Sequence, residues 1–74
     1  MDLKELRNEI DRLDTQIQQL FERRMDIVKA VAAYKKEHDL PVLHAGRENE
    51  VLDKIAAASR PEYRDGSRAL FTAV

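Results

Sequence analysis

Four cations and one carboxylate have the residue types and spacing of an anion-binding site. Arg24 and Lys35 are eleven residues apart, about three turns of an α-helix, so they share a face at roughly 16 Å along the axis. Arg47 and Glu48 are adjacent. Guanidinium groups grip carboxylates through paired hydrogen bonds, and a lone carboxylate accepts a hydrogen bond from a hydroxyl. Together with Arg7, this set suits a small dicarboxylate that bears a hydroxyl group.

A long amphipathic helix must position three of these cations. Ten positions with alternating steps of three and four residues, which we call the seam, lie on one face of it: Leu3, Leu6, Ile10, Leu13, Ile17, Leu20, Arg24, Ile27, Val31 and Tyr34. Arg24 is the one charged member. A buried guanidinium costs several kcal/mol unless anions meet it, which indicates a ligand or partner with carboxylates or phosphates. The alternative is an arginine that pairs with a neighbouring glutamate or extends to water.

The ends of this first helix have clear signals. Asp2 and Glu5 form a capping-box arrangement at its start. Because Pro41 disfavours a helical conformation in Leu40, the helix is expected to end near residues 38–39, and residues 39–43 read as an extended connector.

Two further helices are expected. The second begins around residues 44–46 and directs four side chains inward, Val51, Leu52, Ile55 and Ala58. Ser59 and Glu62, with Pro61 in the first turn, are typical of the start of a third helix. Its apolar face continues through Leu70, Phe71 and Val74. No capping residue, glycine or basic last turn closes this helix, so it is expected to be cut short.

Composition predicts one small all-α domain over residues 1–74. Gly, Pro and aromatic residues are few and 36% of residues are charged, which favours helices over a sheet. A net charge of -1 provides no overall field that would recruit nucleic acid or acidic membrane. No apolar run approaches the roughly 20 residues that span a bilayer. The absence of cysteine excludes disulfides and thiolate metal sites and fits the cytoplasm.

The first helix is too long to bury its seam within one chain. About 36 residues would extend roughly 54 Å, far beyond the width of a domain of this size. An antiparallel homodimer is the simplest closed solution, and a parallel coiled coil is the alternative. Arg7 lies about 25 Å from Arg24 along its own helix. A two-fold axis near Gln18 would bring the partner's Arg7 between Arg24 and Lys35.

The pattern of these residues resembles the all-helical, type II chorismate mutases. The resemblance covers the first two helices and rests on Leu6-Arg7, Ile10, Leu13-Asp14, Arg23-Arg24, Lys35, Pro41-Val42 and Arg47-Glu48. It implies an intertwined homodimer that rearranges chorismate to prephenate, in aromatic amino acid biosynthesis, without a metal or an organic cofactor.

The resemblance also implies a role for each site residue. Arg24 and the partner's Arg7 would hold the substrate carboxylates, and Lys35 would donate to the ether oxygen of the breaking bond. Glu48 would bind the ring hydroxyl, and Arg47 would support the pocket. His44 stands where the family often has an aspartate whose backbone contacts that hydroxyl, so it belongs to the expected substrate-binding set.

One expected feature of the site is missing from these residues. The resemblance places a second donor to the ether oxygen on the third helix, beyond Val74, so a fragment or an impaired enzyme is expected. Two other functions stay open. One is a lyase similar to isochorismate pyruvate lyase, which would bind a near-identical dicarboxylate with the same cations. The other is a helical interaction or regulatory module without turnover.

Overall fold

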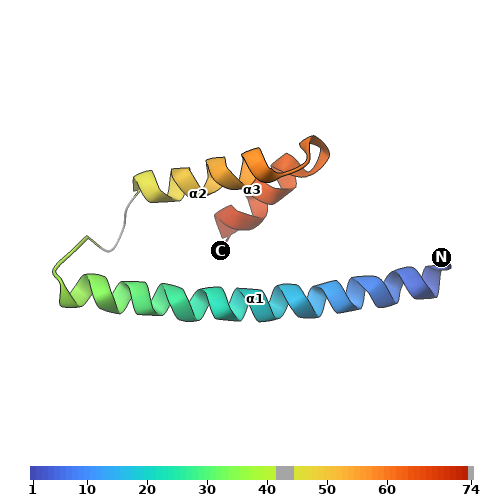
Figure 1. Cartoon of the computed structure of the whole chain (residues 1–74), viewed down its shortest axis with the longest axis horizontal. Coiled ribbons are helices and arrows are strands. Elements are labelled where there is room, and N and C mark those ends of the chain that lie inside the picture. The colour runs from blue at the N-terminus through green and yellow to red at the C-terminus, as the bar shows by residue number, and fades with distance from the viewer. Residues whose placement is uncertain (42–44, 74) are drawn as a thin grey trace. The chain divides into compact units, whose positions relative to one another are not determined.

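The described residues of the chain form three α-helices and one short 3-10 helix. The computed structural model describes residues 1–41 and 45–73. Its elements are α1 (Leu3–Glu37), α2 (Ala45–Ala58), η1 (Pro61–Tyr63) and α3 (Arg64–Ala73) (Figure 1). No strand occurs within these described ranges, so the all-α class is confirmed. The chain divides into two units, residues 1–40 and residues 41–74, which are described separately.

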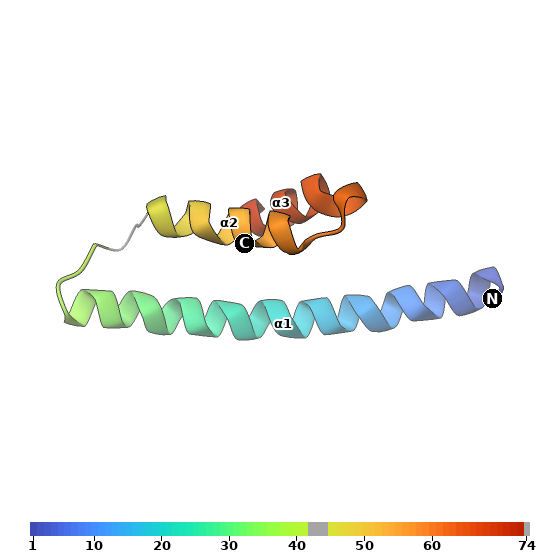
Figure 2. The same cartoon turned by 45° about the horizontal axis from the view of Figure 1, so that its top comes forward.

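The start of α1 is the predicted cap. The carboxylate of Asp2 accepts a hydrogen bond from the backbone N–H of Glu5 at 2.8 Å, and Asp2 itself has extended backbone angles. This bond satisfies one of the N–H groups that the first helical turn leaves without a partner. From here α1 runs without a break for 35 residues (Figure 2).

The end of α1 corrects the prediction of an extended connector at Asp39. His38 is the C-cap, and Asp39 has a positive φ of 55°. The N–H of Leu40 donates to the carbonyl of Lys35 at 2.7 Å, and the N–H of Asp39 donates to that of Lys36 at 3.4 Å. These two bonds form a Schellman motif, which satisfies the last carbonyls by placing one residue in the left-handed region. Pro41 indicates in the sequence where α1 ends, but it does not indicate the Schellman motif that closes the helix.

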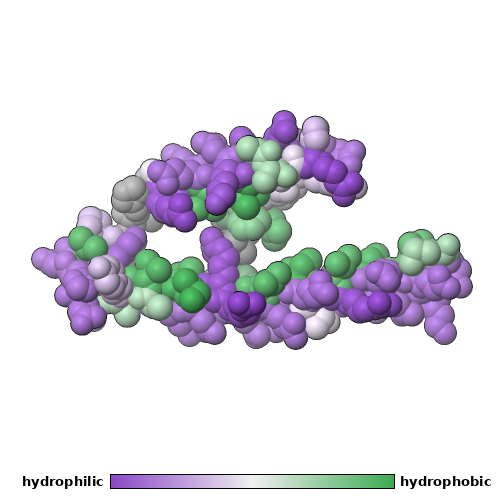
Figure 3. Space-filling view, viewed as in Figure 1, coloured by the Kyte–Doolittle hydropathy of each residue, from purple (hydrophilic) through white to green (hydrophobic). Residues whose placement is uncertain are grey.

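The apolar side chains of the seam are exposed along the whole of α1, whereas Arg24 is half-buried. None of the residues of α1 is buried, and the apolar seam side chains range from 45% exposed at Leu6 to 65% at Ile27. Figure 3 shows apolar side chains gathered along one edge of this helix. Unit 1 contains no second element that would cover them.

In unit 2, α2 and α3 pack against each other, with Ala56 as the most buried residue at 3% exposure. Val51, Leu52 and Ile55 are half-buried, as predicted. The prediction that Ala58 faces inward is wrong, because it is exposed. It is two positions along the chain from Ala56, which is about 200° around the helix, so the two side chains point to opposite faces.

The predicted cap for a third helix is also wrong. Ser59 ends α2 instead: its hydroxyl donates to the carbonyl of Ile55 at 2.7 Å, and its N–H reaches the same carbonyl at 3.0 Å. Pro61 begins η1 after Arg60, which makes no side-chain capping bond, and α3 follows. A serine hydroxyl competes for nearby carbonyls as readily as for N–H groups.

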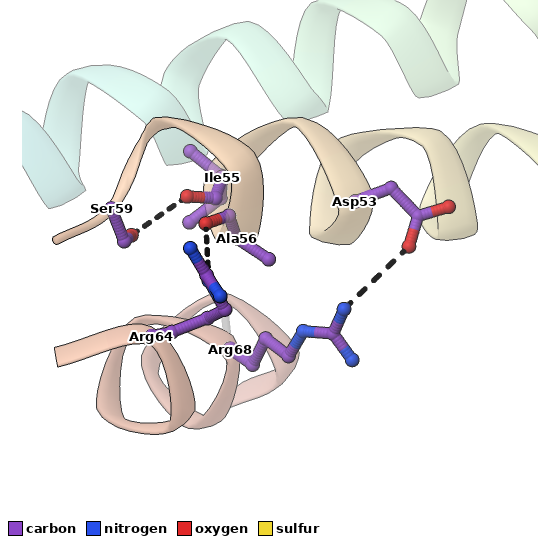
Figure 4. A network of polar contacts seen from close by, with 6 residues as sticks. All are labelled: Asp53, Ile55, Ala56, Ser59, Arg64 and Arg68. Atoms are coloured by element: carbon purple, nitrogen blue, oxygen red, sulfur yellow. Dashed lines mark hydrogen bonds and ion pairs between the residues drawn. The ribbon is translucent and has the colours of Figure 1, made fainter. Parts of the chain in front are cut away.

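The α2–α3 hairpin is held by an arginine. Nε of Arg64 donates to the carbonyl of Ala56 at 3.0 Å, and Arg68 lies 4.0 Å from the carboxylate of Asp53 (Figure 4). Phe71 is half-buried, as predicted, whereas Leu70 is 51% exposed. The predicted position of Val74 on this face lies outside the described residues.

Candidate active site

Three of the predicted site cations lie on α1. Because α1 is continuous over Leu3–Glu37, the predicted spacing holds: Arg24 and Lys35 share one face, roughly 16 Å apart along the axis. Arg7 is about 25 Å from Arg24 in the N-terminal part of the same helix. Within one copy of unit 1, α1 brings Arg24 and Lys35 to one face and keeps Arg7 far from both.

Lys35 is fixed in place by the end of α1. It belongs to the last turn, where a cation interacts favourably with the negative end of the helix dipole. Its backbone carbonyl accepts the Schellman bond from Leu40 at 2.7 Å. The helix cap therefore holds the backbone from which the Lys35 side chain extends.

The other two described site residues begin α2. Glu48 lies in the first turn, where the helix dipole favours a carboxylate. Arg47 is paired with Glu50, with 3.6 Å between guanidinium nitrogen and carboxylate oxygen. Sequence reasoning missed Glu50, although its spacing of three residues from Arg47 is a known helix pairing signal. His44 lies outside the described residues.

The Arg47–Glu50 pair explains how a cation is tolerated near a helix N-terminus. Both side chains are about 70% exposed, 69% for Arg47 and 70% for Glu50. An exposed pair of this kind stabilises by about 0–1 kcal/mol.

Two searches of the described residues concern metal ions and membranes. No group of three or more His, Cys, Asp or Glu side chains that could hold a metal ion is found in residues 1–41 and 45–73. In the same ranges, no helix has the length and apolar character needed to cross a bilayer.

Comparison with known proteins identifies a family and several relatives. Residues 6–74 match the family Chorismate mutase type II. A bifunctional chorismate mutase/prephenate dehydratase of Aquifex aeolicus is 37% identical over 62 residues, which are 84% of this chain and 17% of the relative. The T-protein of Haemophilus influenzae is 44% identical over 50 residues, which are 68% of this chain and 13% of the relative.

A third relative covers a larger share of its own length. A 4-amino-4-deoxychorismate mutase of Streptomyces venezuelae is 36% identical over 55 residues, which are 74% of this chain and 53% of that protein. This chain thus spans about half of that relative and less than a fifth of the other two. No solved structure matches it significantly. Because the family match extends over residues 6–74, the chain belongs to the chorismate mutase type II family.

Proposed function

We propose that this protein is a chorismate mutase, an isomerase that rearranges chorismate to prephenate in aromatic amino acid biosynthesis. The observation that carries the proposal is the family match over residues 6–74. The placement of Arg24 and Lys35 on one face of an unbroken α1 supports it, because two such long side chains can lean toward one small ligand between them.

The proposed chemistry needs positioning and charge rather than a nucleophile. A pericyclic rearrangement forms one carbon–carbon bond as it breaks one carbon–oxygen bond, with no proton transfer. Catalysis therefore consists of holding the flexible enolpyruvyl arm folded over the ring and of stabilising negative charge on the ether oxygen. In our proposal Arg24 grips a carboxylate and Lys35 donates to the ether oxygen.

The residues of α2 complete the proposed pocket. Glu48 accepts a hydrogen bond from the ring hydroxyl, and Arg47 adds positive charge after it exchanges Glu50 for the substrate. His44 is proposed to line the same edge of the pocket. No cofactor or metal takes part in this proposal.

We further propose that the active form is an antiparallel homodimer in the cytoplasm. Exposure of the whole apolar seam supports a second copy, because stripes of this length are normally covered. The distance of about 25 Å between Arg7 and Arg24 supports the antiparallel arrangement, since only the partner's Arg7 would then reach the substrate held by Arg24. Residues 1–74 would act as a single domain in this dimer.

Product analysis tests the proposed function. The purified protein is incubated separately with chorismate and with isochorismate, and the products are identified by NMR. Formation of prephenate from chorismate, lost in Arg24→Ala, is the expected result. Release of pyruvate from isochorismate without prephenate would instead establish the lyase. Failure to turn over either compound or to bind a bicyclic dicarboxylate transition-state mimic would favour a non-catalytic module.

A further inference from the structure

We propose that Arg24 determines how two copies of α1 pair: its charge in the seam excludes the parallel arrangement and selects the antiparallel one. The inference rests on the proposed dimer and adds to the proposed role of Arg24 in substrate binding. It follows from the order of residues along the seam and from the exposure of that seam.

The seam consists of two alternating sets of positions. The first set is Leu3, Ile10, Ile17, Arg24 and Val31, and the second is Leu6, Leu13, Leu20, Ile27 and Tyr34. When two such helices pair in antiparallel orientation, each residue of one set packs in a layer with a residue of the other set. In a parallel pair, each residue packs against its own copy.

In one antiparallel register, every seam position packs against a seam position of the partner. It pairs Leu3 with the partner's Tyr34, Ile10 with Ile27, Ile17 with Leu20, Arg24 with Leu13, and Val31 with Leu6. The two-fold axis then passes between Gln18 and Gln19. The separate requirement that the partner's Arg7 lie between Arg24 and Lys35 places the axis at the same point. Two independent constraints, apolar packing and convergence of cations, therefore agree on one register.

The parallel arrangement brings like charges together. Arg24 would share an apolar layer with its own copy, so that two guanidinium groups would be desolvated side by side. In the antiparallel register, each guanidinium faces the apolar side chain of Leu13 within the seam, and the nearest cation of the partner, Arg7, lies beside the seam rather than in it. A single polar residue in an apolar seam is a known determinant of helix pairing.

The apolar side chains of the seam are exposed, so they can form the contact between two copies of α1. The central layer would be formed by Ile17, 54% exposed, and Leu20, 59% exposed. Within unit 1 no other element covers them, since α1 has no buried residue. Arg24 is the one charged member of this stripe, so within the seam it is the residue that distinguishes the two directions of pairing.

Disulfide trapping tests the orientation directly. The chain has no native cysteine, so Ile10→Cys and Ile27→Cys each introduce a single thiol. The two variants have the same mass, so they are mixed in a glutathione redox buffer, the bridged species are digested, and each bridge is identified by the mass of its disulfide-linked peptides. The antiparallel register places the thiol at 10 opposite the partner's thiol at 27. A parallel pair separates these positions by 17 residues, roughly 25 Å, and bridges each variant only with itself.

The comparison is between four backgrounds. With Arg24 present, mixed 10–27 bridges are expected to exceed same-residue bridges by at least about tenfold, as a difference of 1.4 kcal/mol implies. In Arg24→Leu, same-residue bridges should rise to a comparable level. Arg24→Lys should retain the mixed pattern, because it keeps the charge. Lys29→Leu is the control for loss of a cation outside the seam, and it should also retain the mixed pattern.

Each other outcome overturns the inference. Same-residue bridges at a comparable level with Arg24 present would show that the charge does not select the orientation. An unchanged mixed pattern in Arg24→Leu would assign the selection to other residues, and a failure of Arg24→Leu to assemble would contradict the account, because leucine extends the apolar seam. The proposed function fails separately: an antiparallel dimer without prephenate formation would refute it and leave this inference standing.

Discussion

Units 1 and 2 differ in how their apolar side chains are covered. In unit 2, Ala56 is 3% exposed and α2 and α3 pack against each other. In unit 1, a helix of 35 residues has no buried residue, and Leu20 is 59% exposed. Unit 2 therefore covers part of its apolar surface within one chain, whereas the apolar seam of unit 1 is left without a covering surface in its own unit. Under our proposal, that covering surface is another copy of α1.

The largest expected effect comes from a charge in the centre of the seam. Leu20→Asp should abolish the dimer and most of the helical signal, because burying an unpaired carboxylate in an apolar layer costs several kcal/mol in each copy. A single helix is also only marginally stable in water. Light scattering and circular dichroism at micromolar concentration measure both effects.

Gln18→Asp is the matched control for this prediction. It places the same charge two residues away, on the face of α1 opposite the seam, and should leave the dimer intact. If Leu20→Asp stayed dimeric and helical, the proposal that a second copy covers the seam of unit 1 would be wrong.

The next largest effect is expected from Lys35. Lys35→Ala should lower kcat by about 100-fold or more, because a donor to developing charge acts mainly in the transition state. Lys35→Arg should recover little, since a planar fork differs from an ammonium in reach. Lys36→Ala removes the adjacent cation of the same last turn and should retain parental turnover. Equal rates for Lys35→Ala and Lys36→Ala would refute the assignment.

A smaller effect is expected from the arginine that holds unit 2 together. Arg64→Met removes the hydrogen bond to the carbonyl of Ala56 and should destabilise the protein by about 1 kcal/mol in urea unfolding. Arg68→Met removes only an exposed ion pair at 4.0 Å and should cost less than about 0.5 kcal/mol. A larger loss in Arg68→Met than in Arg64→Met would contradict this ranking.

The smallest effect concerns the cap of α1. Asp39 has a positive φ of 55° and a negative charge at the negative end of a helix. Asp39→Gly should raise the free energy of unfolding by about 0.5 kcal/mol, because glycine adopts this conformation without strain and removes the unfavourable charge. Asp39→Val should lower it, since a β-branched residue resists positive φ. Urea unfolding that ranks valine above glycine would disprove this reading.

Much of the fold could be predicted because it is encoded by local signals. The capping pair Asp2 and Glu5 and the three-four spacing of the seam fix α1 without reference to other elements. Pro41 similarly marked the end of α1. Each of these signals acts through the backbone of its own helix, so no tertiary contact has to be known.

The errors arose where a residue had a choice of partners. Ser59 can cap the helix after it or bond the carbonyls of the helix before it, and the bond from its hydroxyl to the carbonyl of Ile55 shows that it completes the end of α2. The sequence predicts extended geometry at Asp39, because the Schellman bonds that favour a positive φ there cannot be read from the sequence. Ala58 and Ala56 are chemically identical, and only the position of α3 distinguishes them.

Part of the candidate site could also be predicted, because it depends on spacing within a single helix. The relation of Arg24 to Lys35 follows from one helix, so the sequence and the structure agree on it. The Arg47–Glu50 pair was missed, although its helical spacing was available. The proposed convergence of Arg7 with Arg24 involves two chains, and a single chain holds the two residues about 25 Å apart.

Subunit mixing tests the central proposal, a site shared by two copies of this chain, most directly. Arg7→Ala and Arg24→Ala proteins, each inactive as a homodimer, are mixed under conditions in which tagged subunits are shown to exchange. A hybrid dimer has one pocket built from an intact Arg24 and an intact Arg7 of the partner. The account predicts that the mixture regains about a quarter of the parental activity, since half of the dimers are hybrids and one pocket of two is intact. No gain of activity after verified exchange would contradict the shared site.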